Sequence, residues 1–427
     1  MKNNSGTLLF AYWVSCTLQL SQCCSFGHDD LSRRSPVDYT PVITANKLAR
    51  DQRLSRRKAA PSRFAITNTH IFNGVGLSPA STVIVHDGLI EAVCTPECAL
   101  VSVPAEATYD AGGMTLLPGL MDSHAHPSNV THLTALTASG VTTTVLANCA
   151  VAALCASLDD HPGLTTLTRA SLAATSPNST HAAMLLAQGV TLSRLIANLA
   201  QIPSWITTEV STGGAFIKII GSAPGTGLQP AALTLLVREA HAAGIIVVLH
   251  ASSTVAFAQG VAAGADQVHH STLDEAADDG LVAAYVAAGT VVCPTLTMMR
   301  AIVEQLNPAG ASFDAAVKTA RRLHAAGVEL LVGTDGNWEA TSPARVLFGS
   351  SVHDELENMV RLVGMSPVEA LRAATEKPAR AFGLVDRGVV AVGKRADLVL
   401  VEGDPTVDIK SARAVRRVWV GGIEFRE

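Results

Sequence analysis

The stretch "LLPGLMDSHAHPS", residues 116–128, places two histidines one position apart at the end of an apolar run. In a β-strand, side chains at positions i and i+2 point to the same face, so His124 and His126 would project side by side. Two imidazoles at that spacing are able to bind one metal ion. The stretch therefore predicts a buried strand that ends in a pair of metal ligands.

Residues 117–383 alternate short aliphatic strands with Ala- and Leu-rich helical segments. Near-continuous aliphatic strands indicate parallel strands buried on both faces, and repeated strand–helix units favour a (β/α)8 barrel of the TIM type in an α/β protein. An open doubly wound sheet is the alternative. No G-x-G-x-x-G or phosphate-binding loop follows the first strand, so nucleotide binding has no motif to support it.

The two ends of the chain have a different sequence pattern from this central part. Residues 63–116 and 384–427 contain short alternating strands separated by turns, and Asp87-Gly88 is typical of a hairpin. We expect both segments to form one small β-sandwich domain. The 427 residues of the chain are enough for this domain and a barrel of about 250 residues.

The N-terminal residues 1–24 combine Lys2 with an apolar stretch from Thr7 to Leu20. This length fits the core of a secretory signal peptide and is too short for a membrane span. Secretion is one expectation, and a cytoplasmic protein with an N-terminal extension is the alternative. Residues 25–62 carry clustered arginines and little apolar periodicity, so they are predicted to be a flexible lead-in.

The eight cysteines do not form a zinc–thiolate pattern. Cys94 and Cys98 flank a proline-containing turn and could form a disulfide or remain two thiols. Cys149, Cys155 and Cys293 lie in apolar surroundings, so we expect them to pack in the core rather than perform chemistry.

The net charge and the composition indicate which classes of partner the protein is expected to bind. A net charge of −5 and an isoelectric point near 6.3 provide no basic surface of the kind that nucleic-acid-binding proteins use. With 4% aromatic residues, a pocket must be built mainly from aliphatic, histidine and polar groups. The expected partner is a small-molecule substrate, without nucleic acid or a membrane span, and a homo-oligomer is left open.

Polar residues also close the later predicted strands. Lys218 interrupts "FIKII", His250 ends "IIVVLH", His269 and His270 end "ADQVHH", and Asp335 ends "ELLVGTD". The carboxyl ends of parallel barrel strands meet at one rim, where barrel enzymes keep their active sites. Imidazole, carboxylate and a buried lysine together are typical of a site for Zn²⁺ or a similar divalent ion.

Each of these residues also has a structural alternative. A single histidine at a strand end is more often hydrogen-bonded than metal-bound, and Asp335 could cap a following helix. Lys218 could reach solvent, but its neighbours are apolar, and an unpaired ammonium buried among them would cost several kcal/mol. The coincidence of all the residues at strand ends favours the metal site.

The same motifs resemble the amidohydrolase superfamily. "LLPGLMDSHAH" is similar to its first-strand H-x-H motif, "FIKII" to its fourth-strand lysine, "VVLH" and "QVHH" to its fifth- and sixth-strand histidines, and "LLVGTD" to its eighth-strand aspartate. "ALRAATEKPARAFGL" and "GKRADLVLVEGDP" resemble its C-terminal return to the sandwich. Within the superfamily, "GAFIKIIGSAPG" and "VVCPTLTMM" resemble the imidazolonepropionase-like branch, which includes prolidase-type dipeptidases and the fungal ochratoxin-cleaving amidase.

The resemblance implies a binuclear centre for two divalent ions, with Zn²⁺ expected. Members with the fourth-strand lysine use it in carboxylated form to bridge both ions. The more buried ion would be bound by His124, His126 and Asp335, the more exposed one by His250 and His270, and both by Lys218. His270 fits the spacing of the family from Asp266. Because neighbouring strand residues face opposite sides, His269 should point toward the helices.

The resemblance further implies hydrolysis of an amide or other C–N bond in a small acyl-amino, dipeptide-like or lactam substrate. Asp335 would act as the general base and then the general acid. Alternatives are a lactonase or decarboxylase, a tailoring hydrolase of a fungal-type biosynthetic pathway, and a non-catalytic scaffold. "ASS" at 251–253 and Ser271 depart from the family pattern and weaken any inference about the substrate. Loop residues that could line the pocket are Asn129, Thr297, Arg300, Asn337 and Trp338, of which Arg300 could pair with a substrate carboxylate. No G-x-S-x-G elbow supports a serine hydrolase.

Overall fold

The computed structural model describes residues 63–95, 103, 107–159, 161–221, 226–338 and 344–426. The predicted signal peptide, the predicted lead-in and Cys98 lie outside these residues. Across the described ranges, no helix has the length and apolar character needed to cross a membrane.

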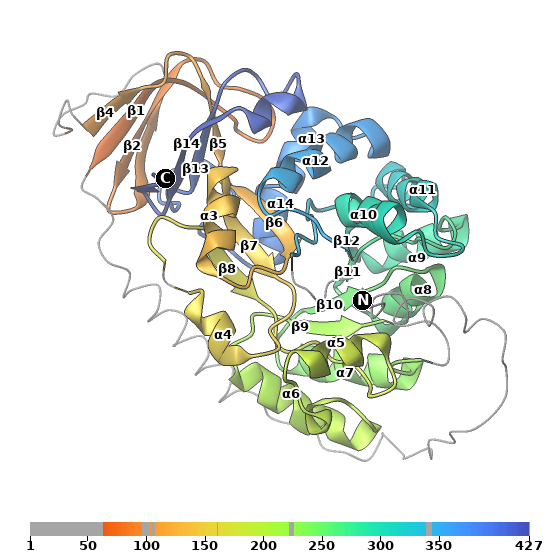
Figure 1. Ribbon diagram of the computed structural model, residues 1–427. Helices are drawn as coiled ribbons and strands as arrows, with labels where there is room; N and C mark the ends of the chain where they lie inside the picture. Colours follow the sequence, from red (N-terminus) through yellow and green to blue (C-terminus); the bar gives the residue numbers. More distant parts are fainter. Residues whose placement is uncertain are drawn as a thin grey trace, which may run out of the picture.

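Both ends of the chain contribute to one eight-stranded sheet, in the order β15-β14-β13-β5-β1-β2-β3 with β4 on β1. The pairing of β13 with β5 is antiparallel and aligns Leu398 with Pro118, so the N- and C-terminal strands lie side by side in Figure 1. The strands are β1 (Phe64–Ile71), β2 (Ser81–His86), β3 (Leu89–Cys94), β4 (Thr108–Asp110), β5 (Thr115–Pro118), β13 (Leu398–Val401), β14 (Val415–Val420) and β15 (Ile423–Glu424).

The hairpin between β2 and β3 forms where it was predicted. Asp87 and Gly88 have φ angles of 49° and 78°, and the two strands pair antiparallel on either side of them. Positive φ at both central residues matches a two-residue turn whose twist fits the strands, and it explains the Asp-Gly sequence.

The central part of the chain forms two parallel sheets, β6-β7-β8 and β9-β10-β11-β12. Isolated parallel bridges connect Ala170 to Phe216, Val292 to Leu330, and Ala125 to Gly336. The prediction of parallel strands followed by helices is thus confirmed. The strands are β6 (Leu120–Ala125), β7 (Val141–Leu146), β8 (Thr166–Arg169), β9 (Ile217–Ile220), β10 (Val247–His250), β11 (Gln267–His269) and β12 (Val291–Cys293).

Seven segments of this region, all in the neighbourhood of parallel strands other than β11, each contribute one side chain to a common apolar cluster. These side chains are Met121, Val145, Ala170, Phe216, Val248, Cys293 and Leu331. Lys218 and His250 lie two residues beyond Phe216 and Val248 on their strands, so they face the same side nearer the carboxyl ends. Cys293 is buried and unbonded, so its predicted role in packing is confirmed.

Helices follow the parallel strands, and Figure 1 shows α7 to α11 along the outside of β9 to β12. Side chains such as those of Ser253 and Asp278 cap the first turns by accepting a backbone hydrogen bond. The helices are α3 (Val130–Ala138), α4 (Ala152–Ser157), α5 (Thr180–Ala187), α6 (Ile202–Ser211), α7 (Pro230–Ala242), α8 (Thr254–Ala263), α9 (Asp279–Ala288), α10 (Leu296–Leu306), α11 (Phe313–Ala325), α12 (Ser350–Asn358), α13 (Pro367–Ala373) and α14 (Glu376–Ala381).

Candidate metal centre

Three histidines from two distant segments, the ends of β6 and β11, converge on Asp335. Its Oδ1 atom lies 3.1 Å from Nε2 of His126 and 3.6 Å from Nε2 of His124, and its Oδ2 atom lies 3.7 Å from Nδ1 of His270. Among the described residues, His124, His270 and Asp335 each offer a ligand atom, and these atoms lie within 4.8 Å of one another. The structure thus brings together three of the predicted ligands around one point, with His126 beside them.

Asp122 holds the two segments that carry His124 and Asp335 in register. Its carboxylate accepts hydrogen bonds from the backbone N–H of His124 at 3.1 Å and from the backbone and hydroxyl of Thr334 at 3.0 and 2.7 Å. The backbone N–H of Asp335 also donates to the carbonyl of His124 at 2.7 Å. These bonds fix the position of Asp335 relative to β6. Asn337 then pairs with Val346 as an isolated bridge, so Asp335 does not cap a helix here.

Lys218 is buried in β9 between apolar neighbours, as the sequence predicts. Its side chain is 3% exposed, and its Nζ atom has no hydrogen-bond partner among the described residues. Burial lowers the pKa of Lys218 to about 8, and the charge of Asp335 opposes that change. A buried amine without a partner is unfavourable, so this position calls for a group that the described side chains do not supply.

The remaining predicted histidines lie next to this cluster. The ring of His250 stands 4.4 Å from that of His270, and the ring of His270 stands 4.7 Å from that of His124, both between centroids. Burial holds the pKa of all three imidazoles well below the ordinary value. They are therefore neutral near pH 7, which is the protonation state that binds metals.

His181 joins the cluster from α5 and was missed by the sequence analysis. Its ring packs edge-on against that of His250 with 4.6 Å between centroids, and burial lowers its pKa to about 4. It lies on a helix beyond β8 rather than at a strand end, so the strand-end pattern could not find it. The available signal was that His181 is the one histidine between residues 162 and 240.

The prediction that His269 points toward the helices is wrong. Its side chain is fully buried, and its Nδ1 atom lies 2.7 Å from Nδ1 of His124. Strand β11 ends at His269, and His270 has a φ of 81°, outside the β region. Because the alternation of side chains ends there, consecutive histidines both reach the cluster. Thr295 contacts the second of them, with its Oγ1 atom 2.9 Å from Nδ1 of His270.

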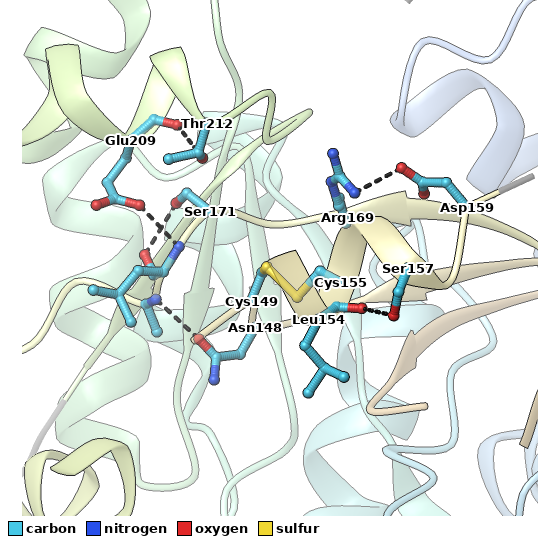
Figure 2. The surroundings of a disulfide bond; sticks show 12 residues. Asn148, Cys149, Leu154, Cys155, Ser157, Asp159, Arg169, Ser171, Glu209 and Thr212 are labelled. Carbon is cyan, nitrogen blue, oxygen red and sulfur yellow. Dashed lines mark hydrogen bonds and ion pairs between the residues drawn. A yellow bond between two sulfur atoms is a disulfide. The ribbon is translucent and has the colours of Figure 1, made fainter. Parts of the chain in front are cut away.

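The expectation that Cys149 and Cys155 only pack in the core is also wrong, because they form a disulfide, shown in Figure 2. The bond closes a loop of six residue steps directly after β7, and both cysteines remain buried. The side chain of Asn148 anchors the same loop by accepting a hydrogen bond from the backbone of Ala173 at 3.0 Å. The apolar surroundings of the cysteines favoured packing over the pairing that their spacing allows.

The residues predicted to line the pocket are engaged by other parts of the protein. The guanidinium of Arg300 lies over the ring of Phe313 at 4.7 Å and donates to Asn358 at 3.2 Å. The ring of Trp338 is covered by Arg345 at 5.2 Å. Asn129 caps α3 by accepting a hydrogen bond from the backbone of His132. Thr297 donates its hydroxyl to the buried Glu355, and Asn337 forms a backbone bridge with Val346.

Residues 115–423 match the amidohydrolase family. The chain belongs to this family. It is 42% identical over 105 residues to an imidazolonepropionase of Deinococcus deserti, covering 24% of this chain and 25% of that protein. It is 33% identical over 198 residues to an imidazolonepropionase of Cereibacter sphaeroides, covering 46% of each. The chain thus matches from a quarter to just under half the length of these relatives.

Solved structures with a similar fold come from the branch suggested by the sequence motifs. A Xaa-Pro dipeptidase with bound methionine superimposes with a TM-score of 0.72 at 20% identity, covering 86% of this chain and 100% of that chain. Aspergillus niger ochratoxinase gives 0.69 at 19% identity, covering 86% and 96%. These neighbours show the fold, of the TIM-barrel type with mixed α and β structure. The family match and the imidazolonepropionase relatives confirm the predicted resemblance.

Proposed function

We propose that the chain is a metal-dependent hydrolase that cleaves an amide or another C–N bond of a small acyl-amino, dipeptide-like or lactam compound. The observation that carries the proposal is the convergence of His124, His126 and His270 on the carboxylate of Asp335. Membership of the amidohydrolase family supports the same reaction class.

The donor set fits two divalent ions. Neutral imidazoles and a carboxylate are ligands that Zn²⁺ prefers. We assign one ion to His124, His126 and Asp335, the other to His250 and His270, and both to a carboxylated Lys218. The unpartnered Nζ atom of Lys218 supports this assignment, because carboxylation and metal binding would satisfy it. Bound metal ions would lower the pKa of a water molecule and polarise the carbonyl of the substrate.

Asp335 is placed to move the proton of the reaction. Its carboxylate is 13% exposed, so it contacts the histidines and remains accessible to a water molecule or substrate. We assign it the removal of the proton from the attacking water and the delivery of that proton to the leaving nitrogen. His181 lies across the same cluster, on His250, and is assigned a contact with the substrate.

The fold proposed for this function is a (β/α)8 barrel closed through residues 330–336, with a small β-sandwich formed by residues 63–116 and 384–427. The parallel bridges on both sides of residues 330–336 and the sheet shared by both chain ends support it. We also propose secretion as the destination of the protein. The disulfide Cys149–Cys155 supports it, because such bonds persist mainly in oxidising compartments.

Metal analysis and a substrate screen together test the proposal. The purified chain is loaded with Zn²⁺, its metal content is measured, and hydrolysis of N-acyl amino acids, dipeptides, lactams and lactones is followed. We expect about two ions per chain, as in other two-metal hydrolases, and release of an amine. Cleavage of lactones alone would favour the lactonase, and an inactive chain without metal would favour the scaffold.

A further inference from the structure

A line of hydrogen bonds runs from the end of α14 to the first histidine of the metal centre. The side-chain amide of Gln267 lies 3.1 Å from the carbonyl oxygen of Ala381, and its Oε1 atom lies 3.1 Å from Nε2 of His269. The Nδ1 atoms of His269 and His124 are 2.7 Å apart. The three side chains are 2%, 0% and 1% exposed, so water does not compete for these bonds.

The direction of every bond in this line follows from its first member. The carbonyl of Ala381 can only accept, so the nitrogen of the Gln267 amide donates to it. The amide oxygen is then left to face His269, and an amide oxygen also only accepts. His269 therefore carries its hydrogen on Nε2.

The tautomer of His269 in turn determines that of His124. With its hydrogen on Nε2, a neutral His269 presents the lone pair of Nδ1 to His124, so the hydrogen between the two rings belongs to Nδ1 of His124. The ring of His269 is buried away from water, where a charged imidazole without a carboxylate partner is disfavoured. The Nε2 atom of His124 is left with a free lone pair, and it is this atom that faces Asp335.

We propose that His269 and Gln267 are positioning residues that fix the tautomer of His124 and so present its Nε2 atom to the metal ion. Neither residue is assigned as a metal ligand. The inference rests on the proposed function for the identity of the ion, whereas the tautomer itself is a property of the metal-free protein. Partners of this kind change metal affinity by about 10–100-fold when removed.

Measuring the Zn²⁺ affinity of variants distinguishes a positioning role of His269 and Gln267 from a role in core packing alone. We expect His269→Leu, which has no acceptor, to weaken the affinity by about 10–100-fold. His269→Asn keeps an oxygen near the position of Nδ1 and should stay closer to the wild type than to His269→Leu. Gln267→Met removes the acceptor for Nε2 of His269, so His269 can change tautomer. This variant should also bind Zn²⁺ more weakly than the wild type, as His269→Leu does. If His269→Leu does not fold, the Zn²⁺ affinities of His269→Asn and Gln267→Met still test the proposal, because only the second variant should bind Zn²⁺ clearly more weakly than the wild type.

The control for loss of a buried hydrogen bond is Tyr285→Phe. The hydroxyl of Tyr285 donates to the carbonyl of Phe257 at 3.1 Å between α9 and α8, outside the metal centre. This variant should lose stability and retain Zn²⁺ affinity. Equal affinity in His269→Leu, Gln267→Met and Tyr285→Phe would overturn the proposal.

Nitrogen NMR of the metal-free protein provides a readout that does not depend on the metal. With ¹⁵N-labelled histidine, we expect His124 to be protonated on Nδ1 in the wild type and to lose that preference in His269→Leu. The signal is assigned by its disappearance in His124→Gln. Protonation of His124 on Nε2 in the wild type would overturn the inference. A wild type that has the expected tautomer but binds no Zn²⁺ would instead contradict the proposed function.

Discussion

The carboxylate of Glu355 accepts two hydrogen bonds from Thr297, one from the backbone N–H at 2.7 Å and one from the hydroxyl at 2.6 Å. The backbone N–H of Leu296 donates a third, at 2.8 Å. Glu355 lies on α12 and thereby caps the start of α10, the helix that follows Thr295 and its contact with His270. A buried carboxylate thus fixes the backbone beside the metal centre.

Glu355 should make stability depend on pH. Burial outweighs its hydrogen bonds and raises its pKa from 4.5 to about 7. A raised pKa in the folded state means that the contribution of this group to stability is complete below pH 4.5 and is lost as the pH rises to about 7. We expect the stability of the wild type relative to Glu355→Gln to fall by about 3 kcal/mol over this range. Urea unfolding of both proteins between pH 4 and pH 8 measures the difference, and a constant difference would contradict it.

Asp335→Asn should separate metal binding from turnover. The amide keeps an oxygen ligand but cannot take a proton, so we expect near-normal metal content with kcat reduced by about 10²–10⁴-fold or more. Metal analysis and kinetics on the same preparation check this. Asp354→Asn is the control, since it removes an exposed carboxylate paired with Arg413. Turnover retained in Asp335→Asn would refute the role of the aspartate.

Lys218→Met tests the buried amine. Methionine has a similar length and no charge, so the metal-free variant should be at least as stable as the metal-free wild type, because an unpartnered buried amine is removed. Its metal content should fall below that of the wild type. Thermal unfolding without metal and metal analysis after loading measure the two effects. Lys318→Met, at an exposed position, serves as the control, and an unchanged metal content in Lys218→Met would show that the amine is not a ligand.

His181→Leu should impair the reaction without emptying the metal centre. His181 contacts His250 but is not among the assigned ligands, so we expect unchanged metal content and a lower kcat/KM. The matched control is His241→Leu, on α7, where the imidazole pairs with Asp266 at 2.8 Å. If both variants had the same kcat/KM as the wild type, His181 would have no contact with the substrate.

The disulfide should contribute to stability through the loop that it closes. For a loop of this size, the chain-entropy relation gives about 2 kcal/mol. Cys149→Ser combined with Cys155→Ser should lose about this amount, and a reductant should destabilise the wild type more than the double variant. Chemical unfolding with and without reductant measures it. A wild type that is insensitive to reductant under unfolding conditions would argue against the bond.

The strand-end residues of the site could be predicted because each obeys the simple periodicity of a buried strand. His124 and His126 are separated by one residue at the end of an apolar run, and Lys218 and His250 continue the inward face of their strands. Parallel strands bring such ends together, so the sequence was sufficient to locate the cluster around Asp335.

The other parts of the site depend on features that periodicity does not encode. His269 reaches the cluster because the backbone of His270 leaves the β region. No local residue preference predicts this change of backbone conformation. His181 arrives on a helix whose position is set by tertiary packing. The pairing of Cys149 with Cys155 depends on the path of the loop after β7. The identity of the substrate depends on loop side chains, which the strand pattern does not constrain.

The antiparallel pairing of β13 with β5 has a consequence for biosynthesis. Strand β5 leads directly into β6 and His124, and the backbone N–H of Gly119 between them donates to the carbonyl of Asp397 at 2.7 Å. Strand β13 is synthesised after β5 and after the whole central region that carries the other histidines. The first histidines are therefore translated early but gain their complete support only once β13 has been made, so metal acquisition is expected to follow the synthesis of β13.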